Sequence, residues 1–214
     1  MLDAAQISQD TVLSVEGLTV HYLLHWTYQV QRGDTVLIHA AAGGVGLIFC
    51  QWARHLGATV IGTVGTAAKA ALAEAHGCDH PIINTERNFR EAVMNITDGK
   101  GVHKALDCSG NVAAHRLCID ATRRRGQVAF VGECSDETSI RISSDMIRKG
   151  LTLVGSWHYN RRDAEAILRI IEERPTVMDQ LISHTFPMTD VQQAFELQST
   201  GDCAKVLLHP WETS

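Results

Sequence analysis

Short runs of apolar and β-branched residues alternate along the chain with longer segments in which apolar residues recur at helical spacing. Each run is apolar enough to be buried on both faces, which is typical of strands in a parallel sheet. The alternation predicts βαβ units that build a doubly wound, six-stranded parallel sheet of the α/β class. The expected strands are Thr35–Ala40, Thr59–Val64, Pro81–Asn84, Lys104–Ser109, Gln127–Gly132 and Leu151–Trp157.

Helices are expected between these strands. Their ranges are Val45–Leu56, Ala67–His76, Asn88–Thr97 and Val112–Arg124, with a short turn of helix at Asp145–Lys149. Gly57, Gly77 and Gly126 follow three of the helical patterns. We expect them to end those helices, because glycine adopts the left-handed conformation of a helix C-terminus without steric cost.

The two ends of the chain differ from its centre. An amphipathic helix is expected at Ser14–Trp26, followed by a turn at Arg32–Asp34 that leads into the first strand. The C-terminal pattern predicts a last strand that has no partner in the six-stranded sheet. The C-terminal elements are expected at Asp163–Glu173 (helix), Leu181–Phe186 (strand), Thr189–Ser199 (helix) and Ala204–Leu208 (strand).

The composition of the chain argues against nucleic acid and membranes as partners. A formal charge of -5, spread over 214 residues without a basic stripe, argues against nucleic-acid binding. The apolar stretches are shorter than the roughly 20 residues that cross a bilayer, so no membrane partner is expected. The six cysteines occur singly, without a C-x-x-C pair. This spacing favours reduced thiols and a cytoplasmic location over a zinc ribbon or a disulfide framework.

The segment between the first strand and its helix carries the clearest chemical signal. Ala41-Ala42-Gly43-Gly44-Val45-Gly46 has the pattern A-x-G-x-x-G, with alanine in place of the usual first glycine. Small residues at a strand-to-helix turn let a pyrophosphate approach the backbone amides of the helix N-terminus. The position between a strand and a helix predicts a dinucleotide site of the Rossmann type. The alternatives are a closely packed turn without ligand and another nucleotide-like ligand such as S-adenosylmethionine.

The end of the second strand bears on the choice of cofactor. NAD-binding sheets commonly place an acidic residue there against the ribose hydroxyls, whereas this chain has Thr63-Val64-Gly65-Thr66. Lys69 follows within a helical turn and would attract a 2′-phosphate. The sequence therefore favours NADP(H) over NAD(H), although Lys69 taken alone is equally consistent with an ordinary solvated lysine.

Three blocks of sequence resemble the medium-chain dehydrogenase/reductase superfamily. They begin at Gly17, His39 and Ile61, and they are similar to NADPH-dependent quinone oxidoreductases from about Val15 to Val102. Beyond about Ala105, the blocks at residues 106–111, 124–133 and 155–159 resemble instead the zinc-containing alcohol and sorbitol dehydrogenases. A recombined or engineered chimera would explain the two likenesses, and so would a divergent natural member.

The resemblance implies roles for particular residues. Thr19 would lie near the nicotinamide, Gly43–Val45 would receive the pyrophosphate, and Lys69 would meet the 2′-phosphate. Ala42 and Gly46 would complete the cofactor-binding turn. Ser109 and Gly132 would close the groove at the carboxyl ends of the fourth and fifth strands, where open α/β sheets bind ligands. The quinone reductase pattern has a tyrosine where this chain has Thr85, which puts one adenine-side contact in doubt.

The resemblance also implies a division of the chain. Residues 1–180 would form a Rossmann domain with its leading helix, and residues 181–214 would be a remnant of a catalytic domain that holds a small-molecule acceptor. The expected function is NADP(H) binding for hydride transfer by an oxidoreductase. The alternative is a non-catalytic or engineered scaffold that binds the cofactor without turnover, or binds nothing.

Other chemistry finds less support in the sequence. His21 and His25 are four residues apart on the leading helix, but no third ligand is nearby, so no metal is expected. A hydrolase of the Ser-His-Asp type is set aside, because no G-x-S-x-G elbow is present. No residue stands out as catalytic. An exposed sixth strand would permit a homodimer by sheet extension.

Overall fold

The computed structural model describes residues 16–83, 89–157, 159–173, 182–200 and 203–210. The chain forms two compact units. One unit spans Val20–His158, and the other combines Met1–Thr19 with Tyr159–Ser214. Thr85 and Ser14 of the sequence analysis lie outside the described residues, as do the expected element ends Asn84, Asn88 and Leu181.

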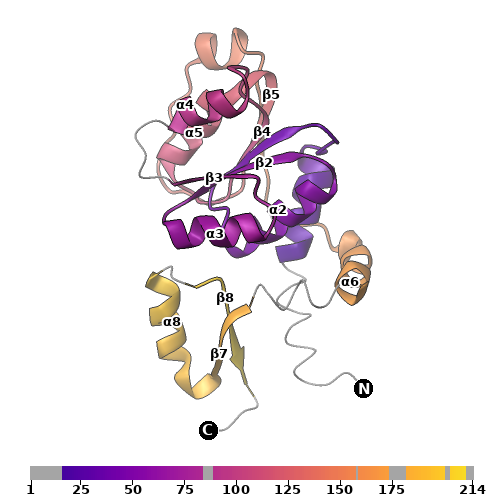
Figure 1. Ribbon diagram of the computed structural model, residues 1–214, viewed down its shortest axis with the longest axis vertical. Helices are drawn as coiled ribbons and strands as arrows, with labels where there is room; N and C mark the ends of the chain where they lie inside the picture. Colours follow the sequence, from indigo (N-terminus) through magenta and orange to yellow (C-terminus); the bar gives the residue numbers. More distant parts are fainter. Residues whose placement is uncertain (1–15, 84–88, 158, 174–181, 201–202, 211–214) are drawn as a thin grey trace. The chain divides into compact units, whose positions relative to one another are not determined.

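The Val20–His158 unit contains the expected six-stranded parallel sheet (Figure 1). The strands have the order β3-β2-β1-β4-β5-β6, so the order reverses between β1 and β4. This arrangement confirms the doubly wound α/β class, and the reversal creates the crevice in which such sheets bind ligands. The strands are β1 Thr35–Ile38, β2 Thr59–Val64, β3 His80–Ile83, β4 Val102–Asp107, β5 Thr122–Phe130 and β6 Thr152–Gly155.

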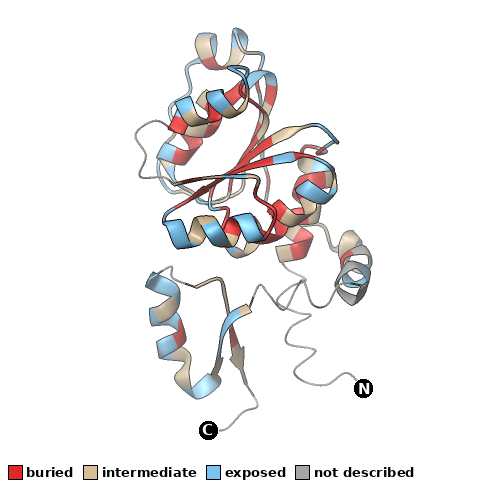
Figure 2. Ribbon diagram, viewed as in Figure 1, coloured by how far each residue is buried: buried red, intermediate tan, exposed pale blue. Residues whose placement is uncertain are grey.

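Helices cover both faces of this sheet. The helices α2 (Gly44–His55) and α3 (Ala67–Ala75) pack together on one face, and α4 (Phe89–Ile96) and α5 (Val112–Ala121) pack on the other. Buried residues concentrate on the strands and on the inward faces of these helices (Figure 2). One core cluster contains Leu37, Ile61, Ala105 and Val128 from four neighbouring strands.

The segments that lead into β1 and β6 also follow the expected pattern. Residues 16–22 are α-helical and continue into the π-helix η1 (Leu23–Thr27). The turn before β1 has Gly33 at φ 86°, and the Asp34 N–H donates to the Gln31 carbonyl over 3.0 Å. A second π-helix, η2 (Ile142–Ile147), lies where a short helical turn was expected.

The boundary between the fifth helix and the fifth strand was predicted wrongly. The sequence pattern extended the fifth helix to Arg124, whereas α5 ends at Ala121 and Thr122–Arg124 belong to β5. Gly126 therefore lies inside a strand and does not end a helix. Gly57 and Gly77 do end helices, with φ values of 84° and 93°.

The other unit contains a small βαβ arrangement. The βαβ elements are β7 (Ile182–Pro187), α8 (Val191–Thr200) and β8 (Lys205–His209), with η4 (Met188–Asp190) between β7 and α8. They follow η3 (Arg161–Asp163) and α6 (Ala164–Glu173) along the chain. Strand β8 lies outside the six-stranded sheet, as expected, but it has a partner, because it pairs in parallel with β7.

Candidate functional site

The glycine turn joins β1 to α2 at the carboxyl edge of the sheet. Ala40 adopts φ 61°, and the Gly43 N–H donates to the Ala40 carbonyl over 3.0 Å. Gly43 then acts as the N-cap of α2 without any side-chain hydrogen bond. Among the described residues, the amides of Gly44, Val45 and Gly46 find no backbone acceptor. They form the positive end of a helix dipole, which is the usual place for a phosphate.

Close packing explains why the turn needs its glycines. A Cβ atom on Gly46 would collide with the backbone carbonyls of Ala40 and Ala41. A Cβ atom on Gly62, in the neighbouring β2, would lie 2.6 Å from the Ala41 side chain. The turn is therefore packed closely against β2. These features fit the pyrophosphate of a dinucleotide.

The carboxyl end of β2 offers a cation and no acid. Thr66 caps α3, because its hydroxyl accepts the Lys69 N–H over 3.2 Å. A Cβ atom on Gly65 would meet nothing within 4 Å, so the space beside this residue is open. The Lys69 side chain is half-buried and has no ion-pair partner in the described ranges. A phosphate beside this helix would meet a positive charge.

The carboxyl ends of β4 and β5 approach each other closely. Gly110 adopts φ 64°, and a Cβ atom on Gly132 would collide with the Gly110 backbone nitrogen. The Gly132 N–H donates to the Asp107 carbonyl over 3.2 Å. Ser109 is exposed at this point of the edge. The segments that follow β4 and β5 thus form one wall beside the point where the strand order reverses.

Asp107 organises this wall, and the sequence analysis gave it no role. Its fully buried carboxylate accepts hydrogen bonds from the Ser109 hydroxyl (2.6 Å), the Ser109 and Gly110 amides (3.1 and 3.0 Å) and His115 Nε2 (3.0 Å). His115 Nδ1 lies 2.7 Å from the Thr138 hydroxyl. Since Asp107, His115 and Thr138 lie on separate segments, no local motif could have revealed the network. The aspartate at the end of a buried strand was the one available signal.

His39 is the second residue that sequence reasoning left without a role. It follows β1, is 1% exposed, and its Nδ1 lies 2.8 Å from the Thr63 hydroxyl. Its ring also stacks against Phe89, with centroids 5.5 Å apart. Burial lowers the pKa of His39 to about 4, so the ring is neutral at pH 7. It ties the end of β1 to β2 directly behind the glycine turn.

The structure gathers most of the expected cofactor residues at one edge. Ala42, Gly43–Gly46, Lys69, Ser109 and Gly132 all belong to the Val20–His158 unit and follow the carboxyl ends of its strands. Thr19 belongs to the other unit, within helical residues 16–22. Its place near a nicotinamide stays a prediction.

Metal chemistry finds no ligand set in the described ranges. No group of three or more His, Cys, Asp or Glu residues there could hold a metal ion. Glu16 forms an ion pair with Lys205 over 2.5 Å, and His21 and His25 stack with centroids 4.6 Å apart.

Comparison with known proteins places the chain among dehydrogenases. A family model described as zinc-binding dehydrogenase matches residues 44–173. The chain is 40% identical over 190 residues to the 2-haloacrylate reductase of a Burkholderia species, which covers 85% of this chain and 57% of that protein. It is 34% identical over 223 aligned positions to quinone oxidoreductase 1 of Escherichia coli K12. This alignment covers 97% of this chain and 66% of that protein.

A relative from the second branch also matches. The sorbitol dehydrogenase of Halalkalibacterium halodurans is 31% identical over 183 residues, covering 85% of this chain and 53% of that protein. The chain therefore spans between 53% and 66% of the length of these curated relatives. Among solved structures, Escherichia coli quinone oxidoreductase in complex with NADPH superimposes with a TM-score of 0.80 and 32% identity. The match covers 98% of this chain and 68% of that protein.

Proposed function

The chain belongs to the zinc-binding dehydrogenase family of the medium-chain dehydrogenase/reductase superfamily, and from this premise we propose that its turn at residues 41–46 binds NADP(H). It is the cofactor-binding domain of an oxidoreductase. The observation that carries the proposal is the run of amides at Gly44–Gly46 that find no acceptor among the described residues, with Lys69 near the carboxyl end of β2. The NADPH complex of the Escherichia coli relative supports the same cofactor.

Each group of the chain has a defined task in this proposal. The amides of α2 bind the pyrophosphate, Lys69 binds the 2′-phosphate, and the Ser109–Gly132 wall bounds the nicotinamide end of the groove. When bound, the cofactor supplies the hydride, and the protein orients it. A small-molecule acceptor is held by a catalytic domain, as the names of the reductase relatives suggest. No step is assigned to a metal, because the described residues bring no ligand set together.

The preference for NADP(H) over NAD(H) is tested by titrating the chain with NADPH and NADH while nicotinamide fluorescence is recorded. Replacing Lys69 with alanine removes one charge-assisted contact to the 2′-phosphate, so we expect NADPH to bind about tenfold more weakly. NADH affinity should stay unchanged, because NADH lacks that phosphate. Lys100→Ala, at an exposed lysine far along the chain, is the charge-matched control.

The outcomes separate three functions. Binding of NADPH without its oxidation by quinones identifies a cofactor-binding domain that needs its catalytic partner, which is the result we expect. Binding of NADPH together with its oxidation by quinones identifies a minimal oxidoreductase. A chain that binds neither nucleotide would be a structural module, and this result would overturn the proposal.

Three further properties are proposed with the function. The edge strand β6 mediates a homodimer by sheet extension. The domain boundary that separates the Rossmann fold from the catalytic remnant lies near residue 180. The cytoplasm is the proposed location, on the spacing of the six cysteines. No helix in the described ranges is both long and apolar enough to span a membrane.

We infer that the likeness to two branches reflects divergence and not recombination. The alignment with 2-haloacrylate reductase covers 85% of this chain, so one relative aligns on both sides of Val102. A chimera would instead match separate relatives on each side of that position.

A further inference from the structure

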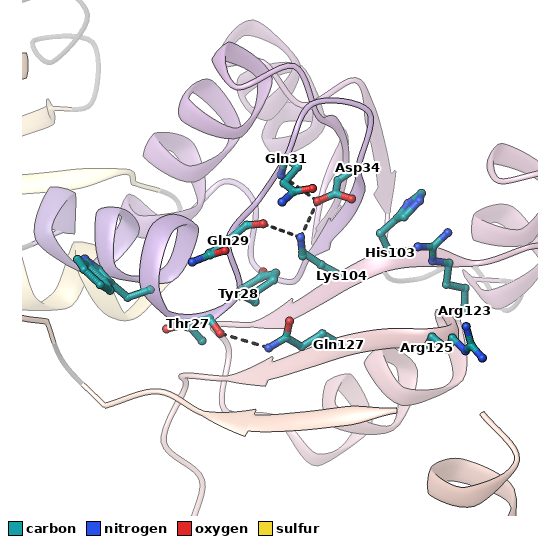
Figure 3. Close-up of a pocket in the computed structure, with 11 residues that line it drawn as sticks. Thr27, Tyr28, Gln29, Gln31, Asp34, His103, Lys104, Arg123, Arg125 and Gln127 are labelled. Atoms are coloured by element: carbon teal, nitrogen blue, oxygen red, sulfur yellow. Dashed lines mark hydrogen bonds and ion pairs between the residues drawn. The ribbon is translucent and has the colours of Figure 1, made fainter. Parts of the chain in front are cut away.

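A polar cavity of about 500 Å³ lies at the amino-terminal edge of the sheet (Figure 3). One wall is the segment after η1, and the others are the first residues of β4 and β5. Because all six strands are parallel, this edge is opposite the glycine turn. The cavity is therefore separate from the proposed NADP(H) site.

Two guanidinium groups in this cavity have no counter-ion among the residues that the structure describes. Lys104 is already paired, since its ammonium group donates to Asp34 over 2.6 Å and to the Gln29 carbonyl over 2.7 Å. Burial raises the pKa of Asp34, but the Lys104 and Gln31 hydrogen bonds outweigh that effect and hold it below its usual value. Within the described ranges, neither Arg123 nor Arg125 has an ion pair or a side-chain acceptor.

A bulge between β4 and β5 presents these arginines. Val102 pairs with Thr122 and Lys104 pairs with Gln127, so residues 123–126 stand opposite His103 alone. Arg125 adopts φ 58°, and its N–H donates to the Lys149 carbonyl over 2.7 Å. Bulges of this kind re-aim side chains and are common beside functional sites. Arg123 and Arg125 both line this cavity, whereas Arg124 lines only a neighbouring one, which Arg125 also borders.

His103 adds a neutral donor to the two cations. Its Nδ1 accepts the Thr35 N–H over 3.0 Å, which leaves the proton of the neutral ring on Nε2. Burial and the nearby Arg123 guanidinium both lower the pKa of His103. Figure 3 shows the Arg123 side chain extending toward the His103 ring. Two guanidinium forks and one N–H donor suit a tetrahedral anion with several acceptor oxygens.

We propose that Arg123, Arg125 and His103 form a second anion site, which binds a phosphoryl group at the amino edge of the sheet. The cavity is larger than inorganic phosphate requires, so a phosphorylated small molecule fits it as well. The site does not depend on cofactor binding at the carboxyl edge.

The test is a titration of the full ¹⁵N-labelled chain with sodium phosphate, against sodium chloride at equal ionic strength, followed by NMR. We expect saturable shifts at the amides of Arg123, Arg125 and Gly126 and at His103 Nε2. The double variant Arg123→Gln/Arg125→Gln should weaken binding by at least about tenfold, since each charged hydrogen bond contributes that order. Its unfolding midpoint should match that of the parent chain, because both arginines are exposed.

Arg124→Gln is the matched control, because this exposed arginine lies in the same bulge but outside the cavity. It should leave the phosphate affinity unchanged, and so should Lys69→Ala, which alters only the proposed cofactor site. Glycerol 3-phosphate binding more tightly than phosphate would identify a phosphomonoester as the ligand, and equal affinities would identify free phosphate. Shifts that do not saturate, or equal weakening by Arg124→Gln, would mean non-specific attraction of an adventitious ion only and would overturn the proposal.

Discussion

Burial changes what a single histidine can do, and His39 shows how. The sequence places it at the end of a buried strand, but its pairing with Thr63 joins two strands and depends on the sheet order. The glycines were predicted more reliably than His39, because Gly43 is the N-cap of α2 and Gly44 and Gly46 lie in its first turn, as the motif at residues 41–46 indicates. Local patterns report local backbone demands, whereas hydrogen bonds between distant segments appear only once the chain is folded.

The low pKa of His39 makes stability depend on pH. The folded ring titrates at about 4, below the roughly 6.5 of an unfolded histidine, so the unfolded chain binds more protons between these values. The stability contributed by the neutral ring is complete above pH 6.5 and is lost as the pH falls to about 4. We expect a loss on the order of 3 kcal/mol in the free energy of unfolding across this window.

Urea unfolding at several pH values measures this loss. The variant His39→Gln removes the titrating ring, and its unfolding free energy should fall less steeply between pH 6.5 and 4 than that of the parent chain. His80→Gln alters an exposed histidine on β3 and should keep the parent slope. An unchanged slope in His39→Gln would show that other groups cause the acid sensitivity.

Gly46 tests the turn by direct steric conflict. In Gly46→Ala the new methyl group would meet the Ala40 and Ala41 carbonyls, so the turn must move away from β2. Overpacking of this kind costs about 1–3 kcal/mol, and the displaced amides should no longer bind NADPH. Calorimetry and nicotinamide fluorescence measure the two effects. Gly65→Ala, where a methyl group meets open space, should keep the parent stability; equal losses in both variants would contradict the steric account.

At the scale of elements, strands were predicted more reliably than helix ends. The helical pattern ran through Thr122 to Arg124, yet α5 ends at Ala121. Lys149 explains the difference, because its ammonium group donates to the carbonyls of Ile119, Asp120 and Thr122 at 2.7–3.1 Å. This lysine satisfies the last carbonyls of α5 and allows the chain to turn into β5. No local pattern predicts a helix end that is fixed by a side chain from a later segment.

The hydrogen bonds of Asp107 predict that its replacement destabilises the loop after β4. In Asp107→Asn, an NH₂ group replaces one carboxylate oxygen. This group cannot accept the hydrogen bonds that the N–H groups now donate to Asp107. We expect the unfolding free energy to fall by about 1–3 kcal/mol, as for a buried hydrogen bond left unmade. Amide exchange should accelerate at Ser109 and Gly110. Asp136→Asn, at an exposed loop position, is the control, and equal exchange rates in both variants would show that the network does not hold the wall.

At the scale of the whole molecule, the alternating pattern was sufficient to predict the parallel sheet. Right-handed βαβ connections restrict the possible orders, and the observed order β3-β2-β1-β4-β5-β6 is one of the two common doubly wound arrangements. The pairing of β7 with β8 was not predicted, because a strand pair outside the main sheet has no periodic signature that names its partner. The cavity at the amino edge was equally hidden, since it depends on a bulge between two strands.

The open edge of this sheet determines how two copies would associate. The Ser156 N–H donates to the Phe130 carbonyl across the β5–β6 pair. Neighbouring residues of a strand face opposite sides, so the Gly155 N–H faces the open edge and is available to a second copy. Gly155→Pro removes this donor, and a side chain there meets nothing within 4 Å.

If β6 extends the sheet into a partner, sedimentation equilibrium should show a dimer for the parent chain and for Gly155→Ala, which keeps the N–H group. Gly155→Pro should dissociate at least about tenfold more readily, because an edge proline cannot donate to the ladder. A parent chain that stays monomeric at high concentration, or a proline variant that dimerises equally well, would exclude pairing through β6.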